Sequence, residues 1–150
     1  MKSFFITGAT GFVGQRLVEA LDGEIRILSR IRQLNYETVI CDLQSEEIPN
    51  DALNEVDTVF HLAGFAHDIR DASKIKGLYQ KVNVDATVRL AELAIKSKVK
   101  RFVFVSSVKA GGLPLFGQCI SEEEQGEPDG IYGETKREAE LKLLEIGLNS

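Results

Sequence analysis

The feature that most constrains this fold is a glycine-rich turn near the start of the chain. Gly8 and Gly11 lie between the apolar run SFFIT at 3–7 and the amphipathic stretch FVGQRLVEAL at 12–21, and Gly14 lies at the start of that stretch. An apolar strand that passes through such a turn directly into a helix is typical of the first unit of an open α/β sheet. The alternative is a turn whose glycines only reverse the chain direction.

The rest of the chain repeats this alternation of apolar and amphipathic stretches. Nearly continuous runs of Phe, Ile and Val are typical of parallel strands buried on both faces, and the stretches between them carry apolar residues at helical spacing. We therefore predict an α/β fold, a Rossmann-type doubly wound parallel sheet of about five strands in the order 3-2-1-4-5. The predicted strands are 3–7, 25–29, 38–41, 58–63 and 101–107, and the predicted helices are 12–21, 82–96 and 134–146.

One long connection, at 108–131, has no periodicity and contains two of the three prolines. A loop of this length inside a compact domain is more often functional than idle. We therefore predict that it contributes to a functional site.

The composition excludes several classes of protein. A chain of 150 residues with 43% hydrophobic and 27% charged residues fits one domain, here 1–150. The net charge of −5 argues against nucleic-acid binding, and no run approaches the ~18 apolar residues that span a membrane. No secretory signal opens the chain, and Cys41 and Cys119 are too few for a disulfide framework. A reducing, cytoplasmic setting is expected.

Each glycine of the turn has a physical role in a dinucleotide site. Gly8 allows a sharp turn off the strand, Gly11 lets a pyrophosphate approach the backbone, and Gly14 lets the helix pack closely on the strand. The helix N-terminus then offers unpaired N–H groups to the phosphates. The turn therefore predicts binding of NAD(P).

The residues after the second and third strands bear on the choice of cofactor. An acidic residue after the second strand normally binds the ribose 2′-hydroxyl of NAD, but Ser29 and Arg30 stand there. Because a guanidinium pairs with a 2′-phosphate, we favour NADP(H) slightly over NAD(H). The alternative is that Arg30 is a solvated loop residue. Asp42, after the third strand, can accept a hydrogen bond from the adenine amino group, or can cap the loop.

A serine, a tyrosine and a lysine form a candidate catalytic set. Lys136 follows Tyr132 by one helical turn, so both can face the same side. A nearby ammonium favours the phenolate form of tyrosine, which makes it a usable general acid or base. Ser107, after the fifth strand, can hydrogen-bond a substrate oxygen. Taken alone, a tyrosine and a lysine at this spacing are more often exposed helix residues.

Two histidines, His61 and His67, raise the question of a metal site. No cysteine or acidic cluster accompanies them at ligand spacing. We therefore interpret both as structural histidines and predict no metal.

Taken together, these motifs resemble the extended branch of the short-chain dehydrogenase/reductase superfamily, which contains NAD(P)-dependent nucleotide-sugar epimerases, dehydratases and reductases. The similar segments occur in the family's order and cover essentially the whole chain. They are TGATGFVG (7–14), CDL (41–43), HLAG (61–64), NVDAT (83–87), RFVFVSSVKAGG (101–112) and YGETKREAE (132–140).

The resemblance implies a role for each matching residue. The residues expected to hold the pyrophosphate are Gly8, Gly11, Phe12, Val13 and Gly14. Asp42 and Leu43 are expected at the adenine, and Leu62, Ala63 and Gly64 at a cofactor ribose. Ser107, Tyr132 and Lys136 match the catalytic set, Lys136 also binds the nicotinamide ribose, and Asn83 braces the site.

The chain departs from the family pattern in three respects, one of which is the missing acidic residue after the second strand. SSVKAGG is closer to the form seen in UDP-N-acetylhexosamine 4-epimerases and 4-keto-sugar reductases than to galactose-type enzymes, and it leaves Ser106 and Ser107 as alternatives, of which we favour Ser107. Family members are about twice as long, so we expect an N-terminal fragment that lacks the C-terminal substrate domain.

We therefore expect the NAD(P)-binding portion of a nucleotide-sugar 4-epimerase or oxidoreductase, with a UDP-sugar as substrate and a homodimer as a possible assembly. These 150 residues alone are expected to bind cofactor with little or no turnover. The alternative is a non-catalytic dinucleotide-binding or dimerisation module of the same fold.

Overall fold

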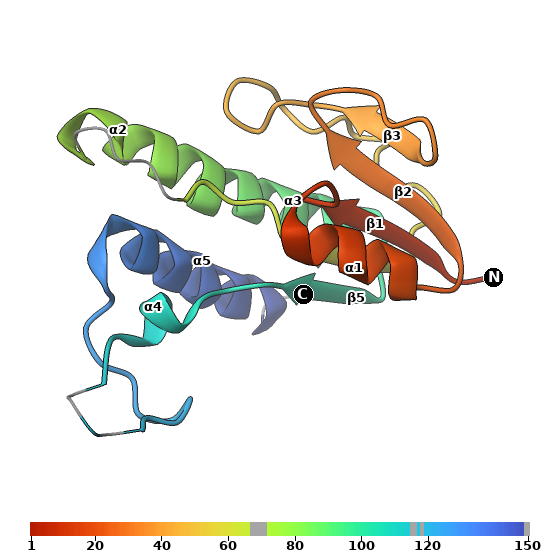
Figure 1. Cartoon of the computed structure of the whole chain (residues 1–150). Helices are drawn as coiled ribbons and strands as arrows, with labels where there is room; N and C mark the ends of the chain where they lie inside the picture. Colours follow the sequence, from red (N-terminus) through yellow and green to blue (C-terminus); the bar gives the residue numbers. More distant parts are fainter. Residues whose placement is uncertain (67–71, 115–116, 118, 149–150) are drawn as a thin grey trace.

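A single parallel sheet organises the chain (Figure 1). The computed structural model describes residues 1–66, 72–114, 117 and 119–148. The strands lie in the order β3-β2-β1-β4-β5, and every neighbouring pair is parallel. Their bounds are β1 (Ser3–Thr7), β2 (Glu24–Ser29), β3 (Glu37–Ile40), β4 (Thr58–His61) and β5 (Arg101–Phe104). The predicted fold and strand order are confirmed.

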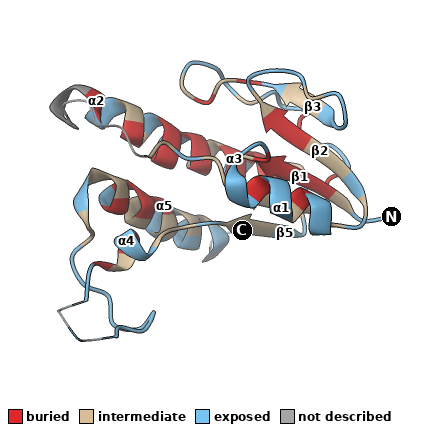
Figure 2. Ribbon diagram, in the orientation of Figure 1, coloured by how far each residue is buried: buried red, intermediate tan, exposed pale blue. Residues whose placement is uncertain are grey.

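β1 lies at the centre of the sheet because it is apolar on both faces. Phe4, Phe5 and Ile6 are all buried, as the red colour of this strand in Figure 2 shows. Phe5 pairs in register with Arg26 of β2 on one side and Val59 of β4 on the other. A central parallel strand needs this composition, since helices cover both faces of the sheet.

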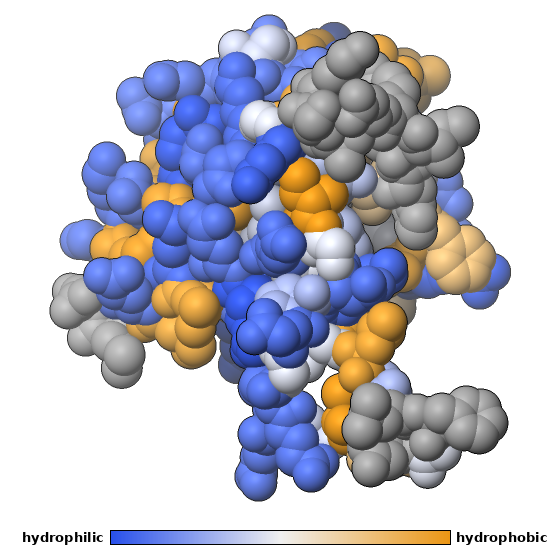
Figure 3. All heavy atoms as spheres, turned by 90° about the vertical axis from the view of Figure 1, so that its left-hand side faces the viewer, coloured by the Kyte–Doolittle hydropathy of each residue, from blue (hydrophilic) through white to orange (hydrophobic). Residues whose placement is uncertain are grey.

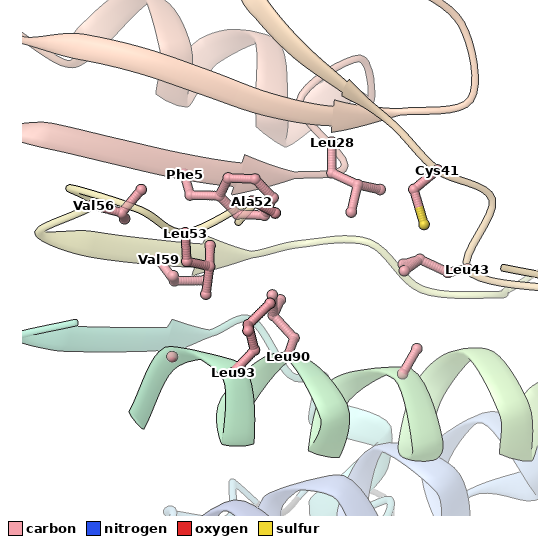
Figure 4. Close-up of a cluster of buried hydrophobic side chains, with 12 residues drawn as sticks. Phe5, Leu28, Cys41, Leu43, Ala52, Leu53, Val56, Val59, Leu90 and Leu93 are labelled. Atoms are coloured by element: carbon pink, nitrogen blue, oxygen red, sulfur yellow. The ribbon is translucent and has the colours of Figure 1, made fainter. Parts of the chain in front are cut away.

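Each face of the sheet has its own hydrophobic core. On one face, Val18 of α1 (Phe12–Ala20) packs with Phe4, Ile6 and Ile27. On the other face, α3 (Ala86–Lys96) contributes Leu90 and Leu93 to a cluster that contains Phe5 and Val59, drawn in Figure 4. The last helix, α5 (Gly130–Leu148), lies beside α3 on this second face.

The helix before β5 is longer than the sequence analysis predicted. It begins at Ala72 with α2 (Ala72–Tyr79), continues through a π-helical segment, η1 (Gln80–Asp85), and runs into α3. The predicted bounds of 82–96 were therefore wrong at the start. Ile75, Tyr79 and Val82 are buried at intervals of four and three residues, which is the helical pattern that the prediction missed.

The connection predicted at 108–131 differs as well: it is shorter in the structure, because helices occupy both of its ends. A single helical turn, α4 (Val108–Gly111), follows β5, and α5 begins at Gly130 rather than at residue 134. Strands β4 and β5 end at His61 and Phe104, two and three residues before their predicted ends. Leu62 and Val105 still donate backbone hydrogen bonds to Thr7 and His61, and the residues that follow them leave the sheet and are available to a site.

Candidate functional site

The glycine turn between β1 and α1 depends on the absence of side chains. Gly8 has φ +74°, and a Cβ atom there would lie 2.7 Å from the backbone nitrogen of Ala63. A Cβ at Gly14 would overlap the carbonyl oxygen of Gly8. Gly11 instead is exposed, and a Cβ there would meet one atom within 4 Å, the Gly8 oxygen at 3.3 Å. Gly8 and Gly14 are thus required by the fold, whereas Gly11 leaves room for a ligand.

The candidate site residues follow the carboxyl ends of adjacent strands. Across the sheet, these positions are Asp42 after β3, Arg30 after β2, Gly8 after β1, Leu62–Gly64 after β4 and Ser106–Ser107 after β5. Figure 3 views this side of the molecule, where near-neutral and hydrophobic residues in the middle are surrounded by hydrophilic ones. In doubly wound folds, ligands bind outside this edge of the sheet.

The candidate residues that follow β2 and β3 are exposed, or they already make contacts within their own loop or the core. Arg30 is exposed. Asp42 is half-buried, and its Oδ1 accepts a hydrogen bond from the backbone of Gln44 at 2.9 Å, which is the loop-capping arrangement. The side chain of Leu43 is buried in the core. Phe12 and Val13, at the start of α1, are exposed.

His61 is fixed at both ring nitrogens by threonines. Its Nδ1 lies 2.6 Å from the Thr7 hydroxyl and its Nε2 lies 2.8 Å from the Thr87 hydroxyl. Because Thr87 donates to the Asn83 carbonyl oxygen, it accepts from Nε2–H. Thr7 then donates to Nδ1 and accepts from the backbone N–H of Ala63 at 3.1 Å. Every proton in this chain of hydrogen bonds has a partner.

Burial keeps His61 neutral. Burial of the ring and, to a smaller extent, the nearby positive charge of Lys136 together lower its pKa to about 3. A neutral ring with one N–H donor is the form that the two threonines require. His61 is therefore a structural histidine. His67 lies outside the described residues, among which no group of three or more His, Cys, Asp or Glu could hold a metal.

Lys136 is a buried lysine of α5, and its side chain reaches the end of β5. Only 2% of its surface is exposed, and its Nζ donates to the carbonyl oxygen of Val105 at 2.7 Å. Nζ also lies 4.1 Å from the centre of the Phe104 ring. Burial lowers the pKa of Lys136 to about 8, against the opposing effect of the Glu140 carboxylate. Burying an ammonium is unfavourable, so lysines in such places are functional candidates.

Asn83 connects three elements around Lys136. Its Oδ1 accepts from the backbone N–H of Phe65 at 2.7 Å, and its Nδ2 donates to the Phe65 carbonyl oxygen and to the Thr135 hydroxyl. A Cβ at Gly64 would lie 3.3 Å from the Asn83 oxygen and 3.9 Å from the Lys136 nitrogen. Asn83 lies in η1, and π-helical turns of this kind are frequent at functional sites.

The two serines and Tyr132 lie around α4 and the first turns of α5. Ser107 caps α4, and its Oγ accepts from the backbone of Lys109 at 3.3 Å. The Ser106 hydroxyl is buried without a hydrogen-bond partner among the described residues. Tyr132 is half-buried, one turn before Lys136. The helices approach closely, since a Cβ at Gly133 would overlap the Lys109 backbone.

Sequence reasoning missed Thr7, Thr87, Phe104 and Gly133. A glycine inside the amphipathic pattern of α5 is a signal of close packing that could have indicated Gly133. The threonines had no local signal, because their partner His61 is 54 and 26 residues away in the sequence.

Comparison with known proteins identifies the family. Residues 4–147 match the family described as NAD dependent epimerase/dehydratase. The chain is 36% identical over 162 residues to UDP-glucose 4-epimerase of Vibrio cholerae, an alignment that covers 99% of this chain and 48% of that protein. It therefore spans about half the length of the curated relatives it matches.

Solved structures agree with this assignment. MoeE5 in complex with UDP-glucose and NAD superposes with a TM-score of 0.83 at 31% identity, covering 96% of this chain and 48% of that one. An NAD-bound short-chain dehydrogenase/reductase superfamily protein from Agrobacterium tumefaciens gives 0.81 at 28% identity, covering 94% of this chain and 44% of the other. No helix within the described residues is long and apolar enough to cross a membrane. The predicted resemblance is confirmed, and the chain belongs to the NAD dependent epimerase/dehydratase family, within the short-chain dehydrogenase/reductase superfamily.

Proposed function

We propose that this chain is the NAD(P)-binding portion of a nucleotide-sugar 4-epimerase or oxidoreductase, with Ser107, Tyr132 and Lys136 as its catalytic residues. The observation that carries the proposal is the buried ammonium of Lys136, which is held at the end of β5. A lysine with only a structural role does not need this position, because its charge is better solvated at the surface.

The row of strand ends supports a dinucleotide that lies along the edge of the sheet. The glycine turn after β1 offers Gly11 and the N-terminus of α1 to a pyrophosphate. Asp42 and Arg30, on the β3 side, are the candidates for the adenosine half. Gly64 and Lys136, on the β5 side, are the candidates for the nicotinamide ribose, and Asn83 braces both.

The chain's own residues supply acid/base chemistry. A nicotinamide held beside Gly64 and Lys136 would supply hydride transfer at C4 of the sugar. Tyr132 removes the proton of the C4 hydroxyl, and the ammonium of Lys136 favours the phenolate that does so. Ser107 donates a hydrogen bond to the C4 oxygen as charge develops on it. An epimerase would need this transfer in both directions, with the return to the opposite face of the sugar, whereas a reductase would need it only toward the sugar.

Cofactor binding is tested by isothermal titration of the 150-residue chain with NAD and NADP. Lys136→Met is expected to weaken binding at least about tenfold, since a hydrogen bond from a charged donor contributes roughly 1.5–3 kcal/mol. The matched control is Lys142→Met, on the same helix but half exposed. Equal effects of the two variants would contradict the proposal. Tighter binding of NADP than of NAD would support a role for Arg30 at a 2′-phosphate.

Turnover is tested in any longer protein that contains this chain. Tyr132→Phe is expected to abolish interconversion of UDP-sugars while leaving cofactor affinity within about twofold. If the protein were instead a non-catalytic dinucleotide-binding module, it would bind the cofactor, but neither the wild type nor the Tyr132→Phe variant would interconvert UDP-sugars. We further propose that the 150 residues alone have little or no turnover. We also propose that they work in a reducing, cytoplasmic setting, and the two free cysteines support this.

A further inference from the structure

Within the described part of the chain, the ammonium of Lys136 contacts the last residue of β5, Phe104, and the residue after it, Val105. Val105 accepts its hydrogen bond through the backbone, and Phe104 presents the face of its ring 4.1 Å away. A lysine side chain has four flexible methylene groups, so one hydrogen bond leaves its charged end several orientations. A second contact from the adjacent residue, in a different direction, restricts them. The position of Nζ therefore depends on where the Phe104 ring lies.

The Phe104 ring is in turn aligned by His61. The two residues are partners in the register of β4 and β5, and their rings stack with centroids 5.7 Å apart and planes 25° apart. His61 cannot rotate freely, because Thr7 and Thr87 hold its two nitrogens. A continuous series of contacts thus runs from the two threonines through both rings to the ammonium.

The charges around Lys136 make the ring contact significant. Its own helix contributes the Glu140 carboxylate and, one turn earlier, Tyr132. β4 contributes His61, which is neutral, and the contacts from β5 are Phe104 and Val105, which do not titrate. Desolvation disfavours the ammonium, whereas the electron-rich face of an aromatic ring favours it over the neutral amine.

We propose that Phe104 is a positioning residue that holds the ammonium of Lys136 at the site, and that His61 aligns the ring for this purpose. The proposal deepens the proposed function, because it concerns the same lysine. Its test uses neither cofactor nor substrate. The positioning role of Phe104 can therefore fail while the proposed function stands, and the proposed function can fail while the positioning role stands.

The test is the pKa of Lys136, followed by NMR through the titration of its 13Cε signal in the 150-residue chain. Phe104→Leu keeps an apolar side chain and removes the ring. Loss of the cation–π contact is expected to lower the pKa of Lys136 by about one unit, because the aromatic face favours the ammonium over the neutral amine. Phe104→Tyr restores an aromatic face and is expected to return the pKa to within about 0.3 units of the wild-type value.

Phe102→Leu is the matched control. Phe102 lies two residues earlier on β5, on the same face, and its ring also approaches His61, at 6.3 Å. It is not among the contacts of Lys136, so its replacement is expected to shift the pKa of Lys136 by less than about 0.3 units. Equal shifts in the two leucine variants, or no shift in Phe104→Leu, would overturn the proposal.

A measurement on the wild-type chain covers the case in which Phe104→Leu does not fold. Methylene protons close to the face of an aromatic ring are shielded by its ring current. The ε-protons of Lys136 are therefore expected upfield of those of Lys142, which is half exposed. Coincident shifts would mean that the ring does not hold the ammonium, and would reject the inference.

Discussion

His61 and Lys136 are two buried ionisable residues whose protonation states are set by their neighbours. His61 is neutral at pH 7 because burial lowers its pKa to about 3. Lys136, with a pKa of about 8, remains mostly protonated there. The neutral imidazole is what lets an ammonium lie close to it, since two positive charges would repel each other in a medium of low dielectric constant.

The state of His61 predicts how stability depends on pH. Below about pH 6.5 the unfolded chain takes up a proton at this residue, whereas the folded chain does not until about pH 3. The unfolded state therefore binds more protons in this range, and stability falls as the pH falls, by about 1.4 kcal/mol per unit. His61→Gln removes this dependence. Urea unfolding between about pH 4.5 and 7 should show that the difference in the free energy of unfolding between wild type and variant shrinks as the pH falls. A constant difference would refute the lowered pKa of His61.

Gly8 gives a second prediction at the scale of one residue. Gly8→Ala is expected to lower the free energy of unfolding by at least about 2 kcal/mol, because φ is +74° and the new methyl group would overlap Ala63. Gly77→Ala is the control of opposite sign. Gly77 lies in α2 with nothing near its Cβ position, so alanine is expected to stabilise by about 0.5–1 kcal/mol. Chemical unfolding measures both.

Among elements, the three-glycine turn was the most predictable and the helix before β5 the least. The turn has a strong local signal, because the backbone atoms nearest to Gly11 and Gly14 lie within six residues of them, and only Gly8 is constrained by a distant segment, at Ala63 after β4. The helix was predicted from residue 82, yet it begins at Ala72 and contains a π-helical segment. A π-helical turn has one more residue than an α-helical turn, and the spacing of apolar residues does not predict it. Hydrogen bonds to residues distant in the sequence stabilise the segment instead, such as those between Asn83 and Phe65.

Asn83 is expected to stabilise this segment substantially. Asn83→Ala removes the partners of both backbone groups of Phe65 and one donor to the Thr135 hydroxyl, and should lower the free energy of unfolding by about 2–4 kcal/mol. Asn54→Ala, at an exposed position, should change it by less than about 0.5 kcal/mol. Hydrogen exchange at the Phe65 amide should accelerate only in the Asn83 variant. Equal losses in the two variants would mean that the amide contacts contribute little.

At the scale of the whole molecule, the strand order could be predicted because few arrangements satisfy alternating strands and helices with right-handed crossovers. The site could be predicted only as a set of positions. That Gly64, Asn83 and Lys136 lie together follows from the packing of η1 and α5 beside the sheet. Such contacts depend on side-chain packing between distant elements, which no local pattern in the sequence encodes.

The exposure of Gly11 predicts that cofactor binding can be separated from folding. A Cβ there would meet only the Gly8 oxygen, at 3.3 Å, so Gly11→Ala at this N-cap position should lower the free energy of unfolding of the chain alone by about 1 kcal/mol. NAD at a hundred times its Kd should stabilise the wild-type chain by about 2.7 kcal/mol. The variant should lose this gain, as measured by thermal unfolding with and without NAD. An equal gain in both proteins would place the pyrophosphate elsewhere.

The central position of β1 also bears on how the chain folds. Its two neighbours are unequally distant in the sequence, since β2 begins at Glu24 and β4 only at Thr58. Closing the shorter loop costs less entropy, so β1 and β2 should pair first. Until β4 arrives, one edge of the apolar strand SFFIT remains open to other chains. The yield of refolding from denaturant should therefore fall as the protein concentration rises.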